Sequence, residues 1–342
     1  MRVASEGLAA VFREPIGAAG VHLEERPLGP PGTGQVAIEL RTAALNRLDL
    51  WVASGAQRVK PPRVLGADGA GVVTASDSHR WKVGDEVVVF PSLCCWECDA
   101  CRSGQQVLCP DFGILGEDED GSACQRLLVP ARNVFSKPGN LTWPEAAAFP
   151  LTFLTAWRML VTRARLRAGE TLLVVGVGAG VGVAALVLGL HLGARVMVTS
   201  RSPQTRRRAL AMGAEAAFDS ASFWQEARDK SGGGVDVVFE HVGPATLDQS
   251  LRSLVRGGRL TLCGSTSGVR AEIGLPRVFL NQIEILGSTM GNAGEFRAVL
   301  DAVEGGAKPV VDSIHPLREV TGALQRLEQT DHFGKVVLEI PS

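Results

Sequence analysis

Short apolar strands and helices alternate along the second half of this chain, and that alternation limits the fold more than any other feature. Residues 172–175 form an uninterrupted apolar run, a glycine-rich turn follows, and residues 181–192 have the composition of a buried helix. The same succession returns with strands expected at 195–199, 235–239, 259–262 and 283–286 and a basic helix at about 204–212. Strands joined by helices in this way form a parallel sheet. We therefore predict an α/β fold built on a doubly wound parallel sheet.

The first half has a different character, which indicates a second domain. Glycine and proline punctuate residues 36–138, and short β-branched runs at 35–40, 71–74 and 86–90 are typical of strands in an irregular β domain. Residues 144–160 are expected to be helical, with a break near Pro150. Beyond residue 287 we expect a helix at 294–303 and a final strand at 335–340. A chain of 342 residues is long enough for two domains that share an interface.

A cysteine-rich segment at residues 91–112 predicts a metal site. Four of its cysteines follow the spacing C-x2-C-x2-C-x7-C, namely Cys95, Cys98, Cys101 and Cys109. Loops this short let thiolates converge on one tetrahedral ion, most often Zn²⁺. Four sulfur ligands leave no position open for water or substrate, so we predict one structural zinc per subunit. The spare thiol of Cys94 could compete as a ligand, but the C-x2-C spacing favours its neighbour.

A glycine turn joins the apolar strand at 172–175 to the helix after it. Its glycines are Gly176, Gly178, Gly180 and Gly182. Glycine lets the backbone approach a pyrophosphate, which the N–H groups and the dipole of the helix N-terminus then bind. The strict G-x-G-x-x-G spacing is not met in this run, and a glycine-rich turn alone could be a tight loop. Its place between a buried strand and an apolar helix favours a dinucleotide site.

The residues after the second strand of this unit indicate which dinucleotide is bound. NAD sites usually carry Asp or Glu there to bind the ribose 2′-hydroxyl, whereas this chain has Ser200 followed by Arg201. Serine removes the repulsion that a 2′-phosphate would meet, and arginine can pair with the phosphate through two hydrogen bonds. We expect NADPH rather than NADH, with Arg201 and, less directly, Arg206 as phosphate ligands. Arg207 and Arg208 are interpreted as a solvated helix face.

Charge and cysteine content exclude several classes of protein. The chain has 35 basic and 36 acidic residues, a net charge of −1, which argues against a dedicated surface for nucleic acid or anionic membranes. Five of the seven cysteines lie between residues 94 and 109, so we expect a reducing cytoplasm rather than a disulfide framework. Glycines interrupt the uncharged stretch at 172–190, and we do not expect it to span a membrane.

Taken in order, the motifs of this chain resemble those of the medium-chain dehydrogenase/reductase superfamily. They are GADGAGVV at 66–73, VGDEVV at 83–88, the four-cysteine lobe, the glycine turn and FGKVVL at 333–338. The resemblance implies a GroES-like β-rich catalytic domain, residues 1–142 and 288–342, interrupted by a Rossmann cofactor-binding domain at 143–287. It also implies a homodimer or homotetramer in which the last Rossmann strand pairs with its copy. Further cofactor contacts implied in this way are Thr155, Val181, His241, Val242, Gly264, Ser265, Ser288 and Lys335.

Zinc-dependent alcohol dehydrogenases of this superfamily hold a catalytic zinc with Cys, His and Cys, and those ligands are missing here. By similarity of the local motifs the three positions fall on Asn46, Ala67 and Thr152, none of which is a good zinc ligand. The pattern of Asn46 and Asp49 resembles instead the quinone oxidoreductase branch, which functions without catalytic zinc. Most members of that branch lack the four-cysteine lobe, so this chain resembles a mixed, lobe-bearing subgroup.

The missing metal determines which substrate we expect. A metal polarises a simple carbonyl, and without one the site needs another strong donor, yet the chain has no tyrosine. A conjugated acceptor demands less, because hydride attack at its β-carbon spreads charge into an enolate that a hydrogen-bond donor can stabilise. We therefore expect NADPH-dependent reduction of a quinone or an α,β-unsaturated carbonyl. Asn46 is the expected donor, assisted by Thr152 or a ribose hydroxyl, and Asp49 either takes part or orders the neighbouring backbone.

Several alternatives stay open at this point. An alcohol dehydrogenase or carbonyl reductase acting without metal would oxidise alcohols, and a non-catalytic NADPH-binding protein would bind cofactor without turnover. Asn46 could simply cap a turn. An acidic small-molecule substrate such as an enoyl-CoA ester is favoured if the cleft is lined by Arg47, Arg58, Lys60 and Arg63.

Overall fold

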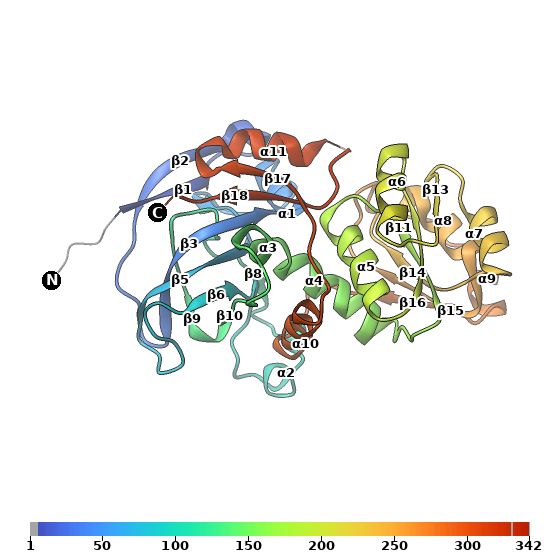
Figure 1. Cartoon of the computed structure of the whole chain (residues 1–342), viewed down its shortest axis with the longest axis horizontal. Coiled ribbons are helices and arrows are strands. Elements are labelled where there is room, and N and C mark those ends of the chain that lie inside the picture. Colours follow the sequence, from blue (N-terminus) through green and yellow to red (C-terminus); the bar gives the residue numbers. More distant parts are fainter. Residues whose placement is uncertain (1–5, 330, 342) are drawn as a thin grey trace.

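The computed structural model describes residues 6–329 and 331–341, and it contains two sheet-based domains side by side (Figure 1). In these residues the domain on the right of Figure 1 carries a six-stranded sheet of order β13-β12-β11-β14-β15-β16. Its strands are β11 (Thr171–Val175), β12 (Arg195–Thr199), β13 (Ala216–Phe218), β14 (Val235–Glu240), β15 (Leu254–Leu262) and β16 (Glu284–Gly287). Every pairing in this sheet is parallel, which confirms the predicted fold class.

Helices cover both faces of this parallel sheet. They are α5 (Gly180–His191), α6 (Pro203–Ala211), α7 (Trp224–Ser231), α8 (Pro244–Ser253) and α9 (Leu275–Leu280). All of β11 is buried, and alternate residues face different clusters: Leu172 and Val174 pack with α5, whereas Leu173 and Val175 pack with α7 and α8. Both faces of this strand are covered, which is why the four residues after Thr171 are all apolar.

The other domain is β-rich, as predicted. In the described part of the chain its main sheet has the order β10-β6-β5-β3-β18-β17, with β9 also paired to β3. These strands are β3 (Gln35–Leu45), β5 (Asp68–Ser76), β6 (Glu86–Val89), β9 (Arg126–Pro130), β10 (Val134–Ser136), β17 (Val311–Pro316) and β18 (Lys335–Glu339). A smaller sheet is formed by β1 (Glu6–Phe12), β2 (Val21–Pro27) and β4 (Arg63–Val64). Because β18 pairs antiparallel with β3, the end of the chain belongs to the first domain.

Short elements complete the β-rich domain. They are α1 (Arg47–Ala53), β7 (Ser92–Leu93), α2 (Asp99–Arg102), β8 (Gly113–Ile114) and α11 (Val320–Glu328). The cysteine lobe lies around α2, between β7 and β8, which pair with each other. Among the described residues, no helix has the length and apolar character needed to cross a membrane.

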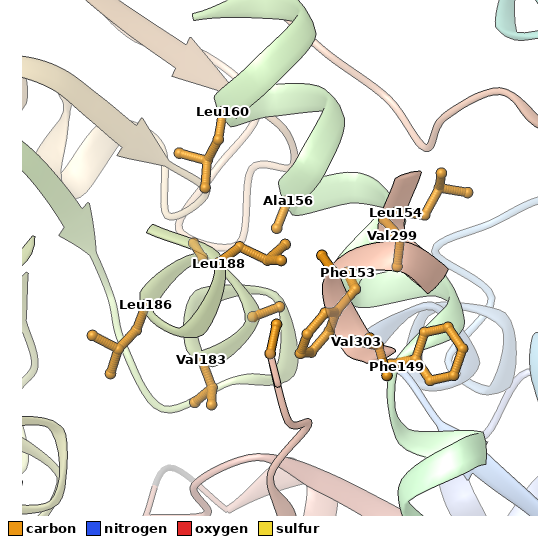
Figure 2. Close-up of a cluster of buried hydrophobic side chains, with 14 of the residues drawn as sticks. Phe149, Phe153, Leu154, Ala156, Leu160, Val183, Leu186, Leu188, Val299 and Val303 are labelled. Carbon is orange, nitrogen blue, oxygen red and sulfur yellow. The ribbon is translucent and has the colours of Figure 1, made fainter. Parts of the chain in front are cut away.

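Two helices carry the chain from one domain to the other. They are α3 (Trp143–Ala148) and α4 (Pro150–Trp157), and a π-helical turn (Arg158–Arg163) follows. Pro150 begins α4, in agreement with the predicted break. Figure 2 shows Phe149 and Phe153 of this segment in one cluster with Val183 of α5 and with α10 (Ala293–Glu304). Phe149 also stacks on Phe296, with ring centroids 5.9 Å apart. This shared, close-packed core fixes the two sheets relative to each other.

Candidate active site

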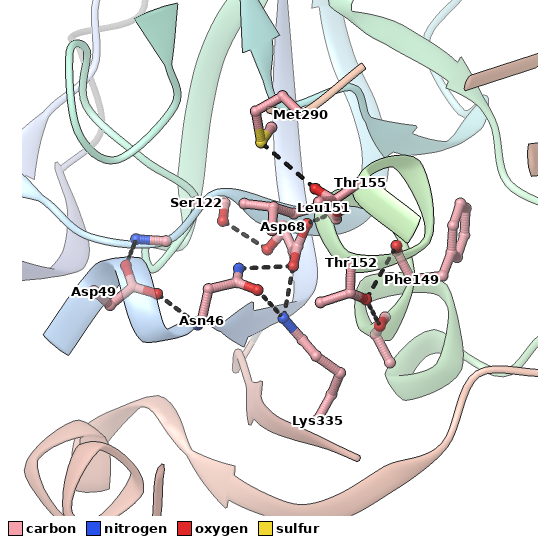
Figure 3. Close-up of polar contacts among 12 residues, drawn as sticks. Asn46, Asp49, Asp68, Ser122, Phe149, Leu151, Thr152, Thr155, Met290 and Lys335 are labelled. Atoms are coloured by element: carbon pink, nitrogen blue, oxygen red, sulfur yellow. Dashed lines mark hydrogen bonds and ion pairs between the residues drawn. The ribbon is translucent and has the colours of Figure 1, made fainter. Parts of the chain in front are cut away.

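A buried polar cluster lies where α1, α4, β5 and β18 approach one another (Figure 3). The Lys335 ammonium, at the start of β18, donates to Oδ1 of Asn46 and, at 2.8 Å, to Oδ2 of Asp68. Nδ2 of Asn46 donates to the same Asp68 oxygen at 2.8 Å. The exposed fraction is 5% for Asn46, 0% for Asp68 and 4% for Lys335. A cation, a carboxylate and an amide therefore form a triangle of hydrogen bonds that is shielded from bulk water.

Asn46 is held in this triangle by the way helix α1 begins. It is the N-cap of α1, and Asp49 completes a capping box with it. The backbone N–H of Asn46 donates to Oδ2 of Asp49 at 2.7 Å, and that of Gly66 donates to Oδ1 at 2.8 Å. Both carboxylate oxygens of Asp49 thus accept backbone N–H groups. This favours a role in ordering the backbone over a direct part in the reaction. A direct part for Asp49 in the reaction stays a prediction.

The burial of Asp49 predicts a dependence of stability on pH. Desolvation raises the pKa of Asp49 from 3.8 to about 6, although its backbone hydrogen bonds oppose the shift. Because the folded pKa is the higher one, this carboxyl stabilises the fold fully below about pH 4, and the contribution is lost as pH rises through about 6. From well below pH 4 to well above pH 6 the unaltered protein should lose about 3 kcal/mol of unfolding free energy relative to Asp49→Asn. Urea unfolding of both proteins across this range measures the difference, and parallel pH profiles would contradict it.

Helix α4 forms another side of the cluster. Oδ1 of Asp68 accepts the backbone N–H of Leu151 at 2.7 Å, which holds the first turn of α4 against β5. The Thr152 hydroxyl makes only long contacts, 3.4 Å each, to carbonyl oxygens of the preceding turn. Thr155 donates to the Leu151 carbonyl at 2.8 Å and lies 3.9 Å from the sulfur of Met290 (Figure 3). The structure therefore brings Thr152 into the region of the cluster and leaves its hydroxyl weakly engaged.

The glycine turn between β11 and α5 has the shape of a phosphate cradle. Gly176 and Gly178 have φ angles of 86° and 136°, which other residues rarely adopt. A Cβ on Gly176 would lie 2.8 Å from the Val242 side chain, and one on Gly180 would lie 2.9 Å from Cδ of Lys335. Helix α5 begins at Gly180, so its first N–H groups face this turn. The residues present therefore fit the pyrophosphate of a dinucleotide.

Most of the other predicted cofactor residues lie at the same carboxyl edge of the parallel sheet. Val181 and Gly182 are in the first turn of α5, while the residues that follow β14, β15 and β16 include His241, Val242, Gly264, Ser265 and Ser288. His241 is buried, and its Nε2 lies 3.1 Å from the carbonyl oxygen of Gly176. Burial lowers the pKa of His241, which favours the neutral imidazole. Doubly wound sheets bind ligands at this edge, so the positions fit a cofactor site, and their individual contacts stay predictions.

The two arginines predicted to bind a 2′-phosphate have different surroundings. Ser200 is buried after β12, whereas Arg201 is exposed, and no carboxylate in the described part of the chain pairs with it. Nη1 of Arg206 donates to the Ser200 carbonyl at 2.6 Å and to Oδ2 of Asp219 at 2.8 Å. Arg206 therefore fixes the turn that carries Ser200, while Arg201 is available to an anionic ligand.

The basic residues near α1 also separate into two groups. Arg58 and Lys60 are exposed, and Arg63 lies 3.7 Å from a carboxylate. Arg47 is half-buried, and its pKa is lowered by burial and then by the like charge of Arg201 in the other domain. Two arginines thus face one region from the two domains, which favours an anion between them.

The pairing of Lys335 with Asp68 was not foreseen from the sequence. The resemblance predicts Lys335 as a cofactor contact, but its ammonium lies on Asp68 and Asn46, and the stem of the side chain borders the glycine turn. Lys335 and Asp68 are 267 positions apart, and no local spacing connects them. A cofactor contact of Lys335 stays a prediction.

The predicted zinc lobe has the geometry of a metal site. One sulfur from each of the four cysteines lies within 4.8 Å of the others, the residues being Cys95, Cys98, Cys101 and Cys109. Sulfurs on a tetrahedral zinc are about 3.8 Å apart, and Sγ of Cys95 lies 3.4 Å from that of Cys109 and 3.9 Å from that of Cys101. Backbone N–H groups of Glu97 and Cys98 donate to Cys95 and lower its pKa to about 6. The donor set fits a structural zinc with every position filled by sulfur.

Known proteins similar to this chain share its two domains. Residues 32–139 match the alcohol dehydrogenase GroES-like domain, and residues 180–305 match the zinc-binding dehydrogenase family. An alcohol dehydrogenase from Geobacillus stearothermophilus is 30% identical over 320 residues, 90% of this chain and 92% of that protein. A crotonyl-CoA reductase from Streptomyces collinus is 29% identical over 361 residues, 92% of this chain and 80% of that protein. The crystal structure of an NAD-dependent alcohol dehydrogenase has a TM-score of 0.94 at 38% identity, covering 98% of this chain and 100% of the other.

Proposed function

This chain belongs to the medium-chain dehydrogenase/reductase superfamily, and from that premise we propose that it transfers hydride from NADPH to a quinone or an α,β-unsaturated carbonyl without a catalytic zinc. This assigns it to the quinone oxidoreductase-like branch. Its relatives include both alcohol dehydrogenases and crotonyl-CoA reductases. The choice between alcohol oxidation and reduction of a conjugated acceptor therefore depends on the residues of the polar cluster.

The observation that carries the proposal is the ammonium beside Asn46. Of the three positions that resemble zinc ligands, Ala67 has no donor atom in its side chain, and the amide oxygen of Asn46 already accepts a hydrogen bond from Lys335. A divalent cation on that oxygen would meet the positive charge of Lys335, which Asp68 holds in place. Charge and donor type both disfavour a catalytic zinc here.

The residues of the site suit reduction of a conjugated acceptor. Bound NADPH supplies the hydride. Asn46 has one amide N–H on Asp68 and a second without an acceptor among the described residues, so the second can stabilise an enolate oxygen. Thr152 can assist, because its own hydrogen bonds are long. The glycine turn and the arginines around it bind the phosphates and orient the cofactor.

A second candidate is oxidation of an alcohol, which the similarity to alcohol dehydrogenases favours. In members that use zinc, this chemistry needs a metal with an open coordination position. Within residues 6–329 and 331–341, the lobe is the only group of three or more His, Cys, Asp or Glu side chains that converges closely enough to hold a metal. This result favours the conjugated acceptor.

The choice of NADPH predicts a selective effect of Arg201. Its replacement in Arg201→Ala removes a charge-assisted pair with the 2′-phosphate, which should weaken NADPH binding about tenfold and leave NADH binding unchanged. Fluorescence titration of both cofactors measures the effect, and Arg207→Ala, on the exposed face of α6, is the matched control. An equal loss for both cofactors would contradict the assignment.

The proposal as a whole is tested by metal content and substrate range together. Purified protein is analysed for zinc per subunit, and NADPH oxidation is followed with a quinone, an enone and a saturated ketone. We expect one zinc, turnover of the first two substrates and little effect of a chelator on short exposure. Two zincs per subunit, or chelator-sensitive turnover of the ketone, would overturn the assignment.

We also propose a homodimer, alone or as half of a tetramer, formed along the edge of the parallel sheet. Strand β16 lies at that edge, and none of the six residues of the adjacent α9 is buried. Leu275, Phe279 and Leu280 of α9 are 58–68% exposed. An apolar edge of this kind is stabilised when it pairs with a second copy.

Phe279→Asp should therefore shift the protein toward the monomer, because it places a charge in the apolar contact. Light scattering of the purified protein reports the mass in solution. Val83→Asp is the control, since Val83 is 72% exposed in the other domain. An unchanged dimer in the Phe279 variant would exclude this surface as the interface.

A further inference from the structure

One proton of the Lys335 ammonium is not used by the fold. An ammonium has three protons, and two of them go to Oδ1 of Asn46 and Oδ2 of Asp68. Across the described parts of the chain, no acceptor takes the third. The side chain is only 4% exposed, so bulk water has little access to it. A buried donor of this kind is best satisfied when a ligand supplies the acceptor.

The stem of Lys335 connects the cofactor cradle to the polar cluster. The backbone N–H of Gly334 donates to the Gly178 carbonyl at 3.0 Å, which anchors the start of β18 on the glycine turn. A Cβ on Gly180 would lie 2.9 Å from Cδ of Lys335 and 3.0 Å from Cγ2 of Thr152. The side chain then runs to Asp68 and Asn46, as Figure 3 shows. Its ammonium is therefore held on Asn46, one of the predicted hydrogen-bond donors, while its stem and Thr152 both border Gly180.

We propose that Lys335 is a catalytic residue that stabilises negative charge on the substrate oxygen, in the part that a metal plays in zinc-dependent enzymes. This inference rests on the proposed function and names the group on which the reaction depends. A full positive charge, shielded from water, attracts an oxyanion more strongly than the neutral groups of Asn46 and Thr152. Asp68 supplies the counter-charge, and Asn46 orients the ammonium.

The step balances on the atoms of the substrate. The β-carbon receives the hydride from NADPH and forms a new C–H bond, and the π electrons of the C=C bond move to give an enolate. The enolate oxygen accepts the third N–H of Lys335. A proton from water then forms the C–H bond at the α-carbon, and NADP⁺ is released. Lys335 keeps its proton throughout, so no base is needed to restore it.

Two simpler roles for Lys335 predict other results. A lysine that only bound a cofactor phosphate would, when removed, raise the Kd for NADPH and leave the hydride-transfer rate of the bound complex unchanged. If Lys335 only completed a structural ion pair, its removal would lower the Tm and would change neither the Kd for NADPH nor the hydride-transfer rate. Rate, cofactor affinity and Tm therefore have to be measured on the same variants.

The experiment uses the full chain with NADPH and cyclohexenone. Stopped-flow single turnovers of Lys335→Met and Lys335→Arg report the hydride-transfer rate, and fluorescence titration reports the Kd for NADPH. Arg158→Met is the matched control, because Arg158 is also a buried cation, 2.9 Å from Glu295, and lies outside the cluster. If Lys335→Met does not fold, the double variant Lys335→Met with Asp68→Asn removes both charges and replaces it.

We expect Lys335→Met to slow hydride transfer about 10²–10³-fold with less than about a threefold change in Kd, and Lys335→Arg to recover part of the rate. Arg158→Met should transfer hydride at the unchanged rate. An unchanged rate in Lys335→Met, or a loss confined to NADPH affinity, overturns the catalytic assignment and leaves the proposed function standing. Failure of the unaltered protein to reduce any enone or quinone overturns both.

Discussion

Cys101→Ser is expected to abolish zinc binding and to unfold the lobe at residues 91–112, while hydride transfer continues. The four sulfurs converge on one point, and Cys101 is buried among them. Zinc contributes on the order of 10 kcal/mol to the order of such small sites, so the loss of one ligand should release the loop. The polar cluster is held by α1, α4, β5 and β18 and does not depend on the lobe for its hydrogen bonds.

Zinc content and limited proteolysis measure this effect. We expect zinc to fall from about one per subunit to none and cleavage to appear within the lobe. Cys94→Ser is the matched control, because Cys94 is adjacent to the site but is not among its four converging sulfurs. Full zinc content and an intact lobe in Cys101→Ser would contradict the structural role, and a complete loss of hydride transfer in folded protein would contradict its separation from the active site.

Asp68→Ala is expected to be the most destabilising change in the active site. Asp68 is fully buried, and its carboxylate accepts hydrogen bonds from Lys335, Asn46 and the backbone of Leu151. Removing it leaves a buried ammonium without its counter-charge, which costs about 3–5 kcal/mol. It also frees the first turn of α4 from β5, so the effect should extend to the contact between the two domains.

Urea unfolding of Asp68→Ala and of the unaltered protein measures this cost. Glu24→Ala provides a control, because it breaks a partly exposed ion pair with Arg13, which solvent screens and whose loss should cost far less. Adding Lys335→Met to Asp68→Ala should restore part of the lost stability, since the uncompensated charge is then gone. Equal costs for Asp68→Ala and Glu24→Ala would show that the buried pair contributes little.

Local patterns in the sequence predicted much of the fold. The apolar run that became β11 is buried on both faces, and the glycine turn after it joins the strand to α5 as expected. The spacing of the lobe cysteines predicted their convergence, because a short loop leaves the thiolates few other arrangements. In contrast, the hairpin of β1 (Glu6–Phe12) and β2 (Val21–Pro27) was not anticipated. Its strands lie before residue 35, where the first β-branched run that predicted a strand begins.

The site was predicted less completely, for a reason that lies in the topology. Asn46 and Thr152 were identified through resemblance, but the ion pair of Lys335 with Asp68 beside Asn46 depends on β18 returning to pair with β3. That return brings Lys335 to Asp68 across 267 positions. Contacts of this kind are set by tertiary packing and leave no periodic signal in the sequence. The direction of the Lys335 side chain is thus a result that only the structure supplies.

The position of a transferred deuterium tests the central claim most directly. NADPH carrying deuterium at the transferring position of C4 is allowed to react with cyclohexenone, and the product is examined by NMR. Our account predicts cyclohexanone with deuterium on the β-carbon, because hydride attacks the conjugated position while the oxygen is stabilised as an enolate. Deuterium on the carbonyl carbon of an allylic alcohol would contradict the account and would indicate alcohol dehydrogenase chemistry.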